Sequence, residues 1–413
     1  MSLSAPDLAP GLRRGDPGFR RVSVGLFFAG FTTFALLYAT QPLLPQLVEV
    51  FAVSPGTASL SVSVTTGGLA VAVIPASALS ERWGRRPVML WSLLGAVAFG
   101  LAAAVAPSFG LLLVLRGLEG LALAGLPAVG MAYLADEVDA GHLGGAMGLY
   151  IAGNSVGGFG GRVVVSAIGD LSGSWRAALG GIAVVSGVCL LAFWLVLPRS
   201  RRFAPSPVAA RELVGEVAAH LRDPVLRRLF ATGLLLMGTF VCAYNYVAFR
   251  LLGPPFSLPD LVVGFVFVLY AVGTVTSTAA GRLSGRWGTR TTVLVASGVA
   301  ALGALAMLAP VLALVVGGLA LLTVGFFAGH AVASAAVGHR ATHGRAVASG
   351  LYLFSYYVGS SVGGTLGGVV FGAAGWSATV AFLVALLAVT AVVVAGLRLP
   401  AGPGSERGAP SIG

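Results

Sequence analysis

The sequence contains no lysine, and only 14 of its 413 residues are Asp or Glu. Charged residues make up 9% of the chain, whereas a soluble domain carries ~25%, so the composition argues against a water-soluble protein. The two cysteines, Cys189 and Cys242, lie in apolar segments without the spacing of a metal site or a disulfide framework. No Ser/His/Asp set, phosphate loop or carboxylate dyad converges at one depth. The sequence therefore predicts neither an enzyme nor a cofactor or metal site.

Apolar residues dominate instead: 57% of the chain is hydrophobic, and 60 residues are glycine. Small residues let apolar helices approach closely in a membrane, which favours a bundle of many helices. A segment of ~20 apolar residues is long enough to cross the hydrocarbon. Twelve such segments are expected, at residues 22–47, 58–79, 87–106, 108–133, 143–168, 175–197, 226–252, 259–281, 291–309, 311–336, 346–372 and 376–397.

One short motif occurs twice. Residues 79–86 recur 204 positions later as residues 283–290, and the two copies differ only where Gly285 replaces Glu81 and Thr289 replaces Arg85. Each copy lies between two apolar segments at the same place in its half. The sequence thus predicts an all-α integral membrane protein of twelve transmembrane helices, in two six-helix repeats with pseudo-two-fold symmetry.

The 25 arginines are distributed unevenly along the chain. If the N-terminus is cytoplasmic, 21 of them fall in inside loops and tails, Arg176 and Arg250 sit at outer ends, and Arg116 and Arg162 lie within spans. The positive-inside rule therefore places both termini in the cytoplasm. No basic patch interleaved with aromatic residues accompanies this charge, so it indicates topology and not a nucleic-acid partner.

These patterns predict five parts. They are a cytoplasmic N-terminal tail (1–21), an N-terminal bundle (22–197), a cytoplasmic connector with an amphipathic helix (198–225), a C-terminal bundle (226–398) and a cytoplasmic tail (399–413). The first apolar run is long and lacks a cleavage site, so we expect an uncleaved helix and not a signal peptide. No long dimerisation segment is evident, and a monomer is expected.

The repeated motif carries a family resemblance. Residues 77–86 resemble the pattern Gly-x-Leu-x-Asp-Arg-x-Gly-Arg-Arg of the major facilitator superfamily, with Ser77 in place of Gly and Glu81 in place of Asp. Within that superfamily the chain is similar to the drug and sugar efflux antiporters of bacterial inner membranes. A carboxylate paired with arginine near this turn can act as a latch that breaks between conformations. The expected latch residues are Glu81, Arg82, Gly84, Arg85, Arg86, Arg286, Gly288 and Arg290.

A second match lies in the fourth span, where residues 116–120 resemble the family signature Arg-x-x-Gln-Gly, with Glu119 at the glutamine position. Arg116 and Glu119 are ~12 to 17 Å deep at 1.5 Å per residue. Charges at that depth face the bundle interior and have a partner. Glu119 is therefore either the proton-coupling carboxylate or a permanent structural partner of Arg116. His330, in the tenth span, is a further candidate for proton coupling.

The third match is in the fifth span. Residues 153–158 resemble the antiporter signature Gly-Pro-x-x-Gly-Gly, with Asn154 in place of proline, and residues 359–364 are their counterpart in span eleven. Glycines at four-residue spacing make a smooth ridge along which a neighbouring helix can slide. The expected sliding glycines are Gly153, Gly157, Gly161, Gly359 and Gly363.

Polar residues inside the spans are candidates for the substrate cavity. The run Tyr38 to Pro42 interrupts span one, and Tyr244 to Tyr246 occupies the equivalent place in span seven. Matching polar breaks in both halves indicate a binding site. The candidates are Tyr38, Gln41, Tyr150, Asn154, Tyr244, Asn245, Tyr352 and Tyr356, each alternatively an interhelical hydrogen bond or an interfacial anchor. Arg162 and Arg250 either attract anions or extend their side chains to the interface.

The sequence therefore predicts a secondary active transporter of a bacterial-type inner membrane, working by alternating access. Its expected partners are protons, the lipid bilayer and a small substrate. The favoured interpretation is a proton-coupled efflux antiporter of small amphipathic compounds, whether drugs, sugars or metabolites. A proton symporter, an uncoupled facilitator and a membrane sensor of the same fold remain alternatives.

Overall fold

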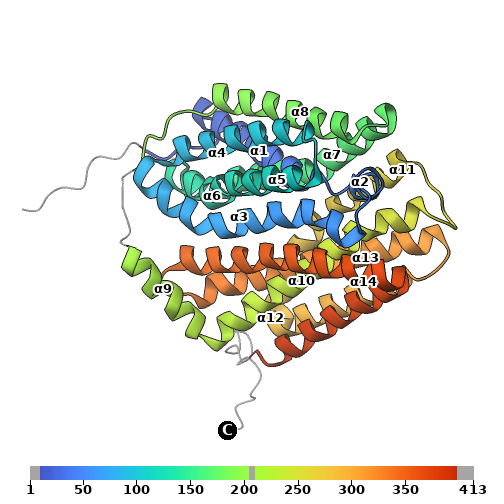
Figure 1. Cartoon of the computed structure of the whole chain (residues 1–413). Helices are drawn as coiled ribbons and strands as arrows, with labels where there is room; N and C mark the ends of the chain where they lie inside the picture. The colour runs from blue at the N-terminus through green and yellow to red at the C-terminus, as the bar shows by residue number, and fades with distance from the viewer. Residues whose placement is uncertain (1–9, 204–209, 398–413) are drawn as a thin grey trace, which may run out of the picture. The chain divides into compact units, whose positions relative to one another are not determined.

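A computed structural model describes residues 10–203 and 210–397, and its regular elements are helices throughout (Figure 1). The first half of the chain forms α1 (Pro17–Leu37), α2 (Leu44–Phe51), α3 (Pro55–Trp83), α4 (Arg85–Ala104), α5 (Phe109–Leu123), α6 (Gly125–Glu137), α7 (Leu143–Ser172) and α8 (Trp175–Val196). The second half forms α9 (Ala210–Arg222), α10 (Pro224–Leu252), α11 (Asp260–Gly264), the 3-10 helix η1 (Phe265–Ala271), α12 (Val272–Ala306), α13 (Leu312–Arg340) and α14 (Arg345–Ala395).

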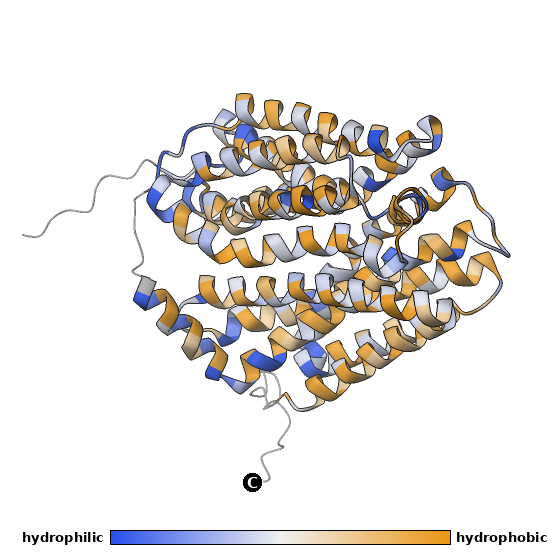
Figure 2. Cartoon of the chain, in the orientation of Figure 1, coloured by the Kyte–Doolittle hydropathy of each residue, from blue (hydrophilic) through white to orange (hydrophobic). Residues whose placement is uncertain are grey.

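Within the described residues, nine stretches are long and apolar enough to cross a membrane, α5 and α6 together making one of them. Two of the nine, Asp260–Ala306 and Arg345–Ala395, are each long enough for two spans and are each divided at a glycine with positive φ, Gly288 and Gly375. α7, with 30 residues, supplies the twelfth span. Apolar residues cover the helices along their length, while hydrophilic residues gather near helix ends and connectors (Figure 2). The predicted fold of twelve transmembrane helices is confirmed.

The repeated motif makes the same backbone turn in both halves. Gly84 (φ 94°, ψ 151°) separates α3 from α4, and Gly288 (φ 77°, ψ 159°) breaks α12 at the equivalent place. Side chains larger than hydrogen are strained at such angles, so glycine alone is accommodated without cost. This local constraint explains why both copies of the motif retain glycine at this position.

The described residues fold into two compact units, one made of those within Met1–Leu43 and Val64–Ala210 and the other of those within Leu44–Ser63 and Arg211–Gly413. The division does not follow the chain order, because α2 and the first turns of α3 belong to the second unit. Reciprocal hydrogen bonds hold them there: the Ser63 hydroxyl donates to the Ser361 carbonyl (3.0 Å), and the Ser361 hydroxyl donates to the Ser63 carbonyl (2.7 Å).

Glycines bring α1 and α7 together in the first unit. A Cβ on Gly157 would lie 2.5 Å from the Cα of Phe31, and one on Gly161 would lie 2.7 Å from the Cα of Ala35. α10 and α14 meet in the same way in the second unit, where a Cβ on Gly359 would lie 2.7 Å from the Cα of Leu234. Backbone therefore packs on backbone at both glycine ridges, which is the packing that small residues permit in membranes.

Two boundaries differ from the sequence-based expectation. α1 begins at Pro17, five residues before the expected start of the first span at residue 22, and Leu12 pairs with Val138 in an isolated parallel bridge. The expected helix break occurs only in the first half: α1 ends at Leu37 before Pro42, whereas Tyr244 to Tyr246 lie inside the continuous helix α10. Proline disfavours the helical conformation of the residue before it, and α10 has no proline after its first turn. The expected tail 399–413 lies outside the described residues.

The connector helix α9 leads into a capped start of α10. The Asp223 carboxylate accepts hydrogen bonds from the N–H groups of Val225 (2.8 Å) and Leu226 (3.2 Å), and its other oxygen accepts one from Nε of Arg340 (2.9 Å). Partial burial by itself raises the pKa of Asp223, but the Val225 N–H and the Arg340 guanidinium outweigh it and hold this pKa below its usual range. The charged form of Asp223 thus stabilises the fold.

Because the pKa of Asp223 is lowered in the folded state, its contribution is present above the unfolded pKa of about 3.9 and is lost as the pH falls through the folded pKa. We expect Asp223→Asn, which keeps a capping side chain, to lower the thermal unfolding midpoint at pH 7. The difference from the unsubstituted protein is expected to shrink below pH 4. Asp223→Ala, which also loses the cap, costs about 1 kcal/mol more. A difference that stays constant from pH 7 to pH 3 would contradict this assignment.

Candidate functional site

A buried ion pair lies inside the transmembrane helix α5. Arg116 and Glu119 are both 0% exposed, and Nη1 of Arg116 lies 2.6 Å from Oε2 of Glu119. The helix begins at Phe109, so Glu119 is about 15 Å along the axis at 1.5 Å per residue, near the middle of a hydrocarbon layer ~30 Å thick. The i,i+3 spacing that the sequence provides places both side chains on one face of α5.

The end of α1 completes the coordination of Arg116. Its guanidinium donates to the carbonyls of Leu36 (3.1 Å) and Leu37 (2.9 Å), the last two residues of that helix. The last carbonyls of a helix have no partner within the helix and accept hydrogen bonds from other groups. The early end of α1 therefore creates acceptors for a charge on α5.

Only one oxygen of Glu119 is hydrogen-bonded. Within the described residues, Oε2 accepts from Arg116, whereas the buried Oε1 has no hydrogen-bond partner. A Cβ on Gly100 of α4 would lie 3.2 Å from Oε1, so this atom lies where α4 packs closely against α5. A proton on Oε1 would remove the negative charge while Oε2 still accepts from the guanidinium.

A second buried guanidinium connects the polar run after α1 to α7. Arg162 is 1% exposed, its Nε donates to Oε1 of Gln41 (2.6 Å), and its Nη1 donates to the Gly158 carbonyl. Its Cζ lies 4.5 Å from the centroid of the Tyr38 ring, within the range of a cation–π contact. Extension of Arg162 to the membrane interface is therefore wrong, because this side chain is enclosed in its unit.

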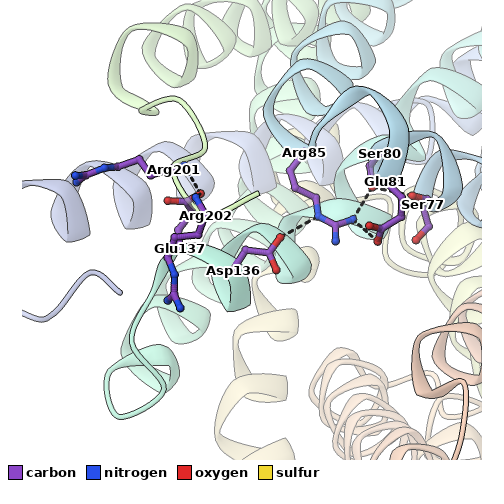
Figure 3. A network of polar contacts seen from close by, with 8 residues as sticks. All are labelled: Ser77, Ser80, Glu81, Arg85, Asp136, Glu137, Arg201 and Arg202. Atoms are coloured by element: carbon purple, nitrogen blue, oxygen red, sulfur yellow. Dashed lines mark hydrogen bonds and ion pairs between the residues drawn. The ribbon is translucent and has the colours of Figure 1, made fainter. Parts of the chain in front are cut away.

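The first copy of the repeated motif forms an ion-pair network (Figure 3). The guanidinium of Arg85 lies 2.7 Å from Oε1 of Glu81 and 3.1 Å from Oδ2 of Asp136, on α6. It also donates to the Ser80 hydroxyl (2.8 Å), which donates in turn to the Ser77 carbonyl (2.7 Å). Asp136 was not predicted as a latch residue, because it lies 51 positions from Arg85 and carries no local signal.

Further contacts surround this network. Arg86 donates to the carbonyls of Leu197 (3.1 Å) and Trp194 (3.3 Å) at the end of α8, where a cation is favoured by the helix dipole. Oε1 of Glu137, a residue that was not predicted either, accepts from the N–H groups of Arg201 (2.7 Å) and Arg202 (3.2 Å). Charged groups thus connect α3, α4, α6 and the end of α8 in the first unit.

The second copy of the motif makes no such network. Arg286, Gly288 and Arg290 are exposed, and the side chain of neither arginine has a hydrogen bond or ion pair among residues 10–203 and 210–397. Gly285 stands where the first copy has Glu81, and Thr289 where it has Arg85, so both members of the ion pair are missing. Arg82 is also exposed and without such a contact. Of the expected latch residues, the structure brings together Glu81 and Arg85, held by the turn at Gly84.

Removing Arg85 leaves Glu81 and Asp136 facing one another without a cation. We expect Arg85→Gln to destabilise the protein by about 1 to 3 kcal/mol, less than a fully buried pair because both carboxylates are partly exposed. The double variant Arg85→Gln/Asp136→Asn should recover part of this loss. A double-mutant cycle on thermal unfolding measures the coupling, and additive effects of the two substitutions would show that the ion pair contributes nothing.

Aromatic rings gather in the second unit. Phe240 of α10 stacks on Phe326 of α13 with centroids 3.9 Å apart, and His330 lies 4.7 Å from the ring of Tyr356 of α14. The aromatic cluster consists of Phe240, Tyr244, Phe267, Tyr270, Phe326, Phe327, His330, Tyr352 and Tyr356. Its phenylalanines and Tyr270 were not predicted, because an apolar ring in a membrane span has no distinguishing pattern.

His330 is held inside this cluster by Tyr352. The Nδ1 atom of His330 and the Tyr352 hydroxyl are 3.0 Å apart, and that hydroxyl also lies 3.3 Å from the His330 carbonyl. Tyr244 is held similarly by the Thr323 hydroxyl (2.8 Å). The aromatic rings are therefore fixed by hydrogen bonds as well as by stacking, which suits a preformed apolar surface.

The eight candidate substrate residues divide by exposure. Asn154 and Tyr356 are half-buried, whereas the others are at most 4% exposed: Tyr38, Gln41, Tyr150, Tyr244, Asn245 and Tyr352. Both cysteines are free thiols, and the described residues contain no group of three His, Cys, Asp or Glu side chains that could hold a metal ion.

Comparison with known proteins shows the family. The model of the Major Facilitator Superfamily matches residues 26–329 and 245–413. The inner membrane transport protein YnfM of Escherichia coli is 42% identical over 97% of this chain and 94% of that protein. An uncharacterized MFS-type transporter, YybF of Bacillus subtilis, is 45% identical over 85% of this chain and 87% of that protein. The chain belongs to the major facilitator superfamily, so it is a multi-pass membrane transporter and not an enzyme.

More distant similarities agree with this family. The chloramphenicol resistance protein of Streptomyces lividans is 32% identical over 59% of this chain and 62% of that protein. The inward-facing, occupied structure of a bacterial homologue of the human lysosomal transporter Spinster has a TM-score of 0.74, with 15% identity over 92% of this chain and 96% of that chain. The structural match supports the fold alone.

Proposed function

We propose that this transporter is a proton-coupled efflux antiporter of small amphipathic compounds. The observation that carries the proposal is the buried pair of Arg116 and Glu119, with Oε1 of Glu119 left without a partner. Ionisable residues at this depth of a membrane are costly and mark ion or proton pathways. Protonation of Oε1 weakens the attraction to Arg116 and thereby changes which arrangement of α1, α4 and α5 is favoured.

Membrane orientation follows from the arginines. We propose that both termini are cytoplasmic, because the network around Arg85 and the contacts of Arg86 lie at the arginine-rich helix ends. The network of Glu81, Arg85 and Asp136 then acts as a cytoplasmic latch, intact in this conformation. Its opening would release α4 from α6 during the transport cycle.

Each unit has its own candidate for substrate contact, Asn154 in the first and Tyr356 in the second. Both are half-buried, and Tyr356 is one ring of the aromatic cluster. Amide and phenol groups beside aromatic rings suit an uncharged or weakly charged ligand with a ring or another apolar part. The buried candidates stabilise their own units by hydrogen bonds. The similarity to a chloramphenicol resistance protein supports drugs as one class of substrate.

Proteoliposomes test the proposal directly. We impose a pH gradient that drives protons across the membrane in the direction opposite to the substrate. We then expect purified protein to move a lipophilic dye, or one member of a labelled sugar and drug panel, against its own concentration gradient. Collapse of the pH gradient with an ionophore should abolish this movement. Accumulation in the direction of proton entry would instead indicate a symporter, gradient-insensitive flux a facilitator, and ligand binding without flux a sensor.

A further inference from the structure

A basic cavity of about 690 Å³ lies beside the beginning of α1 and the end of α8. Three arginines line it, together with one carboxylate, and apolar side chains form another part of its wall. The lining includes Arg14, Asp16, Phe19, Arg20, Arg21 and Val196. Its volume is within the roughly 300 to 1,000 Å³ of small-ligand sites.

Helix lengths place this cavity at a membrane interface. α1 has 21 residues and α8 has 22, which at 1.5 Å per residue gives about 31 and 33 Å, close to the hydrocarbon thickness of ~30 Å. The cavity adjoins the first turn of α1 and the last residue of α8. It therefore lies where phospholipid headgroups meet the ends of both spans, on whichever side of the membrane these ends face.

The positive charge of the lining is free to act on a ligand. The side chains of Arg14 and Arg20 have no hydrogen bond or ion pair in the part of the chain that the structure describes. Nε of Arg21 donates to the Val196 carbonyl (3.2 Å), which fixes this side chain against the end of α8. Asp16 accepts from the backbone N–H of Arg13 (2.7 Å) and so is already hydrogen-bonded. Three cations against one carboxylate favour an anionic occupant.

The segment that carries these arginines is held in place. Leu12 is 8% exposed, its N–H donates to the Glu137 carbonyl (2.9 Å), and its own carbonyl accepts from the Asp139 N–H (3.0 Å). The N–H of Gly141 and the His142 imidazole lower the pKa of Asp139, so this loop has hydrogen bonds of its own. A segment fixed at both ends presents its guanidinium groups at lower entropic cost.

We propose that this cavity binds the headgroup of an anionic phospholipid, such as phosphatidylglycerol. The phosphate contacts Arg14, Arg20 and Arg21, while Phe19 and Val196 contact the glycerol and the first carbons of the acyl chains. Basic pockets between transmembrane helices bind anionic headgroups in this way, and guanidinium groups match phosphate geometry. The site is separate from Glu119, so its occupancy is testable independently of proton coupling.

Native mass spectrometry of the purified full chain tests this site with phosphatidylglycerol and phosphatidylcholine of identical acyl chains. We expect the protein to retain phosphatidylglycerol preferentially. The triple variant Arg14→Gln/Arg20→Gln/Arg21→Gln should weaken that binding by at least tenfold, because each arginine near an anionic headgroup contributes about fivefold. Substitution of the same three residues by lysine should retain most of the preference.

A matched control removes the same charge elsewhere. Arg211, Arg222 and Arg227 are exposed and have no hydrogen bond or ion pair of their side chains in the described chain. Their triple Gln variant should bind phosphatidylglycerol as the unsubstituted protein does. Equal losses in both triple variants would overturn the proposal in favour of diffuse attraction by net charge. Displacement of the lipid by millimolar inorganic phosphate would also overturn it, because the site would then take soluble phosphate.

Discussion

Substitution of Glu119 by Gln is expected to abolish substrate movement driven by a pH gradient while leaving substrate exchange without a gradient. The amide has the size of the protonated acid and can still accept a hydrogen bond from Arg116 through its oxygen. It cannot bind or release a proton near neutral pH, so the variant is fixed in one charge state. We expect a complete loss of gradient-driven flux in proteoliposomes. The rate of substrate exchange should stay within a fewfold of that of the unsubstituted protein.

Two controls accompany this measurement. Glu49→Gln removes an exposed carboxylate of α2 and should leave both fluxes unchanged, whereas His330→Gln tests the other candidate for coupling. Removing one partner of a buried pair can cost 3 to 5 kcal/mol, so the unfolding midpoint of Glu119→Gln must be measured before its flux is interpreted. Gradient-driven flux that persists in a folded Glu119→Gln protein would make Glu119 a structural partner of Arg116 only.

Gly157→Ala is expected to destabilise the protein by at least 1 to 3 kcal/mol. The added Cβ would lie 2.5 Å from the Cα of Phe31, and the obstacle is backbone, which cannot rotate away as a side chain can. α1 and α7 must therefore separate, and the hydrogen bonds of Arg162 to Gln41 and of Arg116 to the end of α1 are strained with them. We expect a lower unfolding midpoint and reduced transport.

The matched control lies on the same helix. A Cβ on Gly148 of α7 meets no atom within 4 Å, so Gly148→Ala should be neutral or stabilise the protein by up to about 1 kcal/mol through its higher helix propensity. Unfolding of both variants in the same detergent compares the two positions. Equal midpoints for Gly157→Ala and Gly148→Ala would show that the α1–α7 contact relaxes without cost.

The local sequence was sufficient to predict the spans, the turns at glycine and the buried pair of Arg116 and Glu119. Apolar length predicts a membrane helix because the bilayer imposes its thickness on every segment. Glycine at positions 84 and 288 marks positive φ angles because no other residue adopts them cheaply. Arg116 and Glu119 meet because three residues separate them on one helix. Each of these features depends on neighbours within one turn or one span.

Contacts between distant segments were not predictable in the same way. Asp136 approaches Arg85, and Gln41 approaches Arg162, only because helices far apart in the chain pack together. The backbone carbonyls of Leu36 and Leu37 carry no signal in side-chain patterns, although they complete the coordination of Arg116. The aromatic cluster likewise draws rings from α10, η1, α13 and α14, and its phenylalanines and Tyr270 are indistinguishable from ordinary membrane-facing residues in their own segments.

The sequence by itself determined that this chain is a twelve-helix membrane transporter made of two related halves, because hydrophobic length, charge bias and a repeated turn are properties of short segments. Tertiary structure alone decided which contacts these residues make in each unit. The first unit contains the buried guanidinium groups and the intact ion-pair network, whereas the second contains the aromatic cluster and an exposed copy of the motif. This difference arises because a charge or a ring acquires its role from what is packed against it.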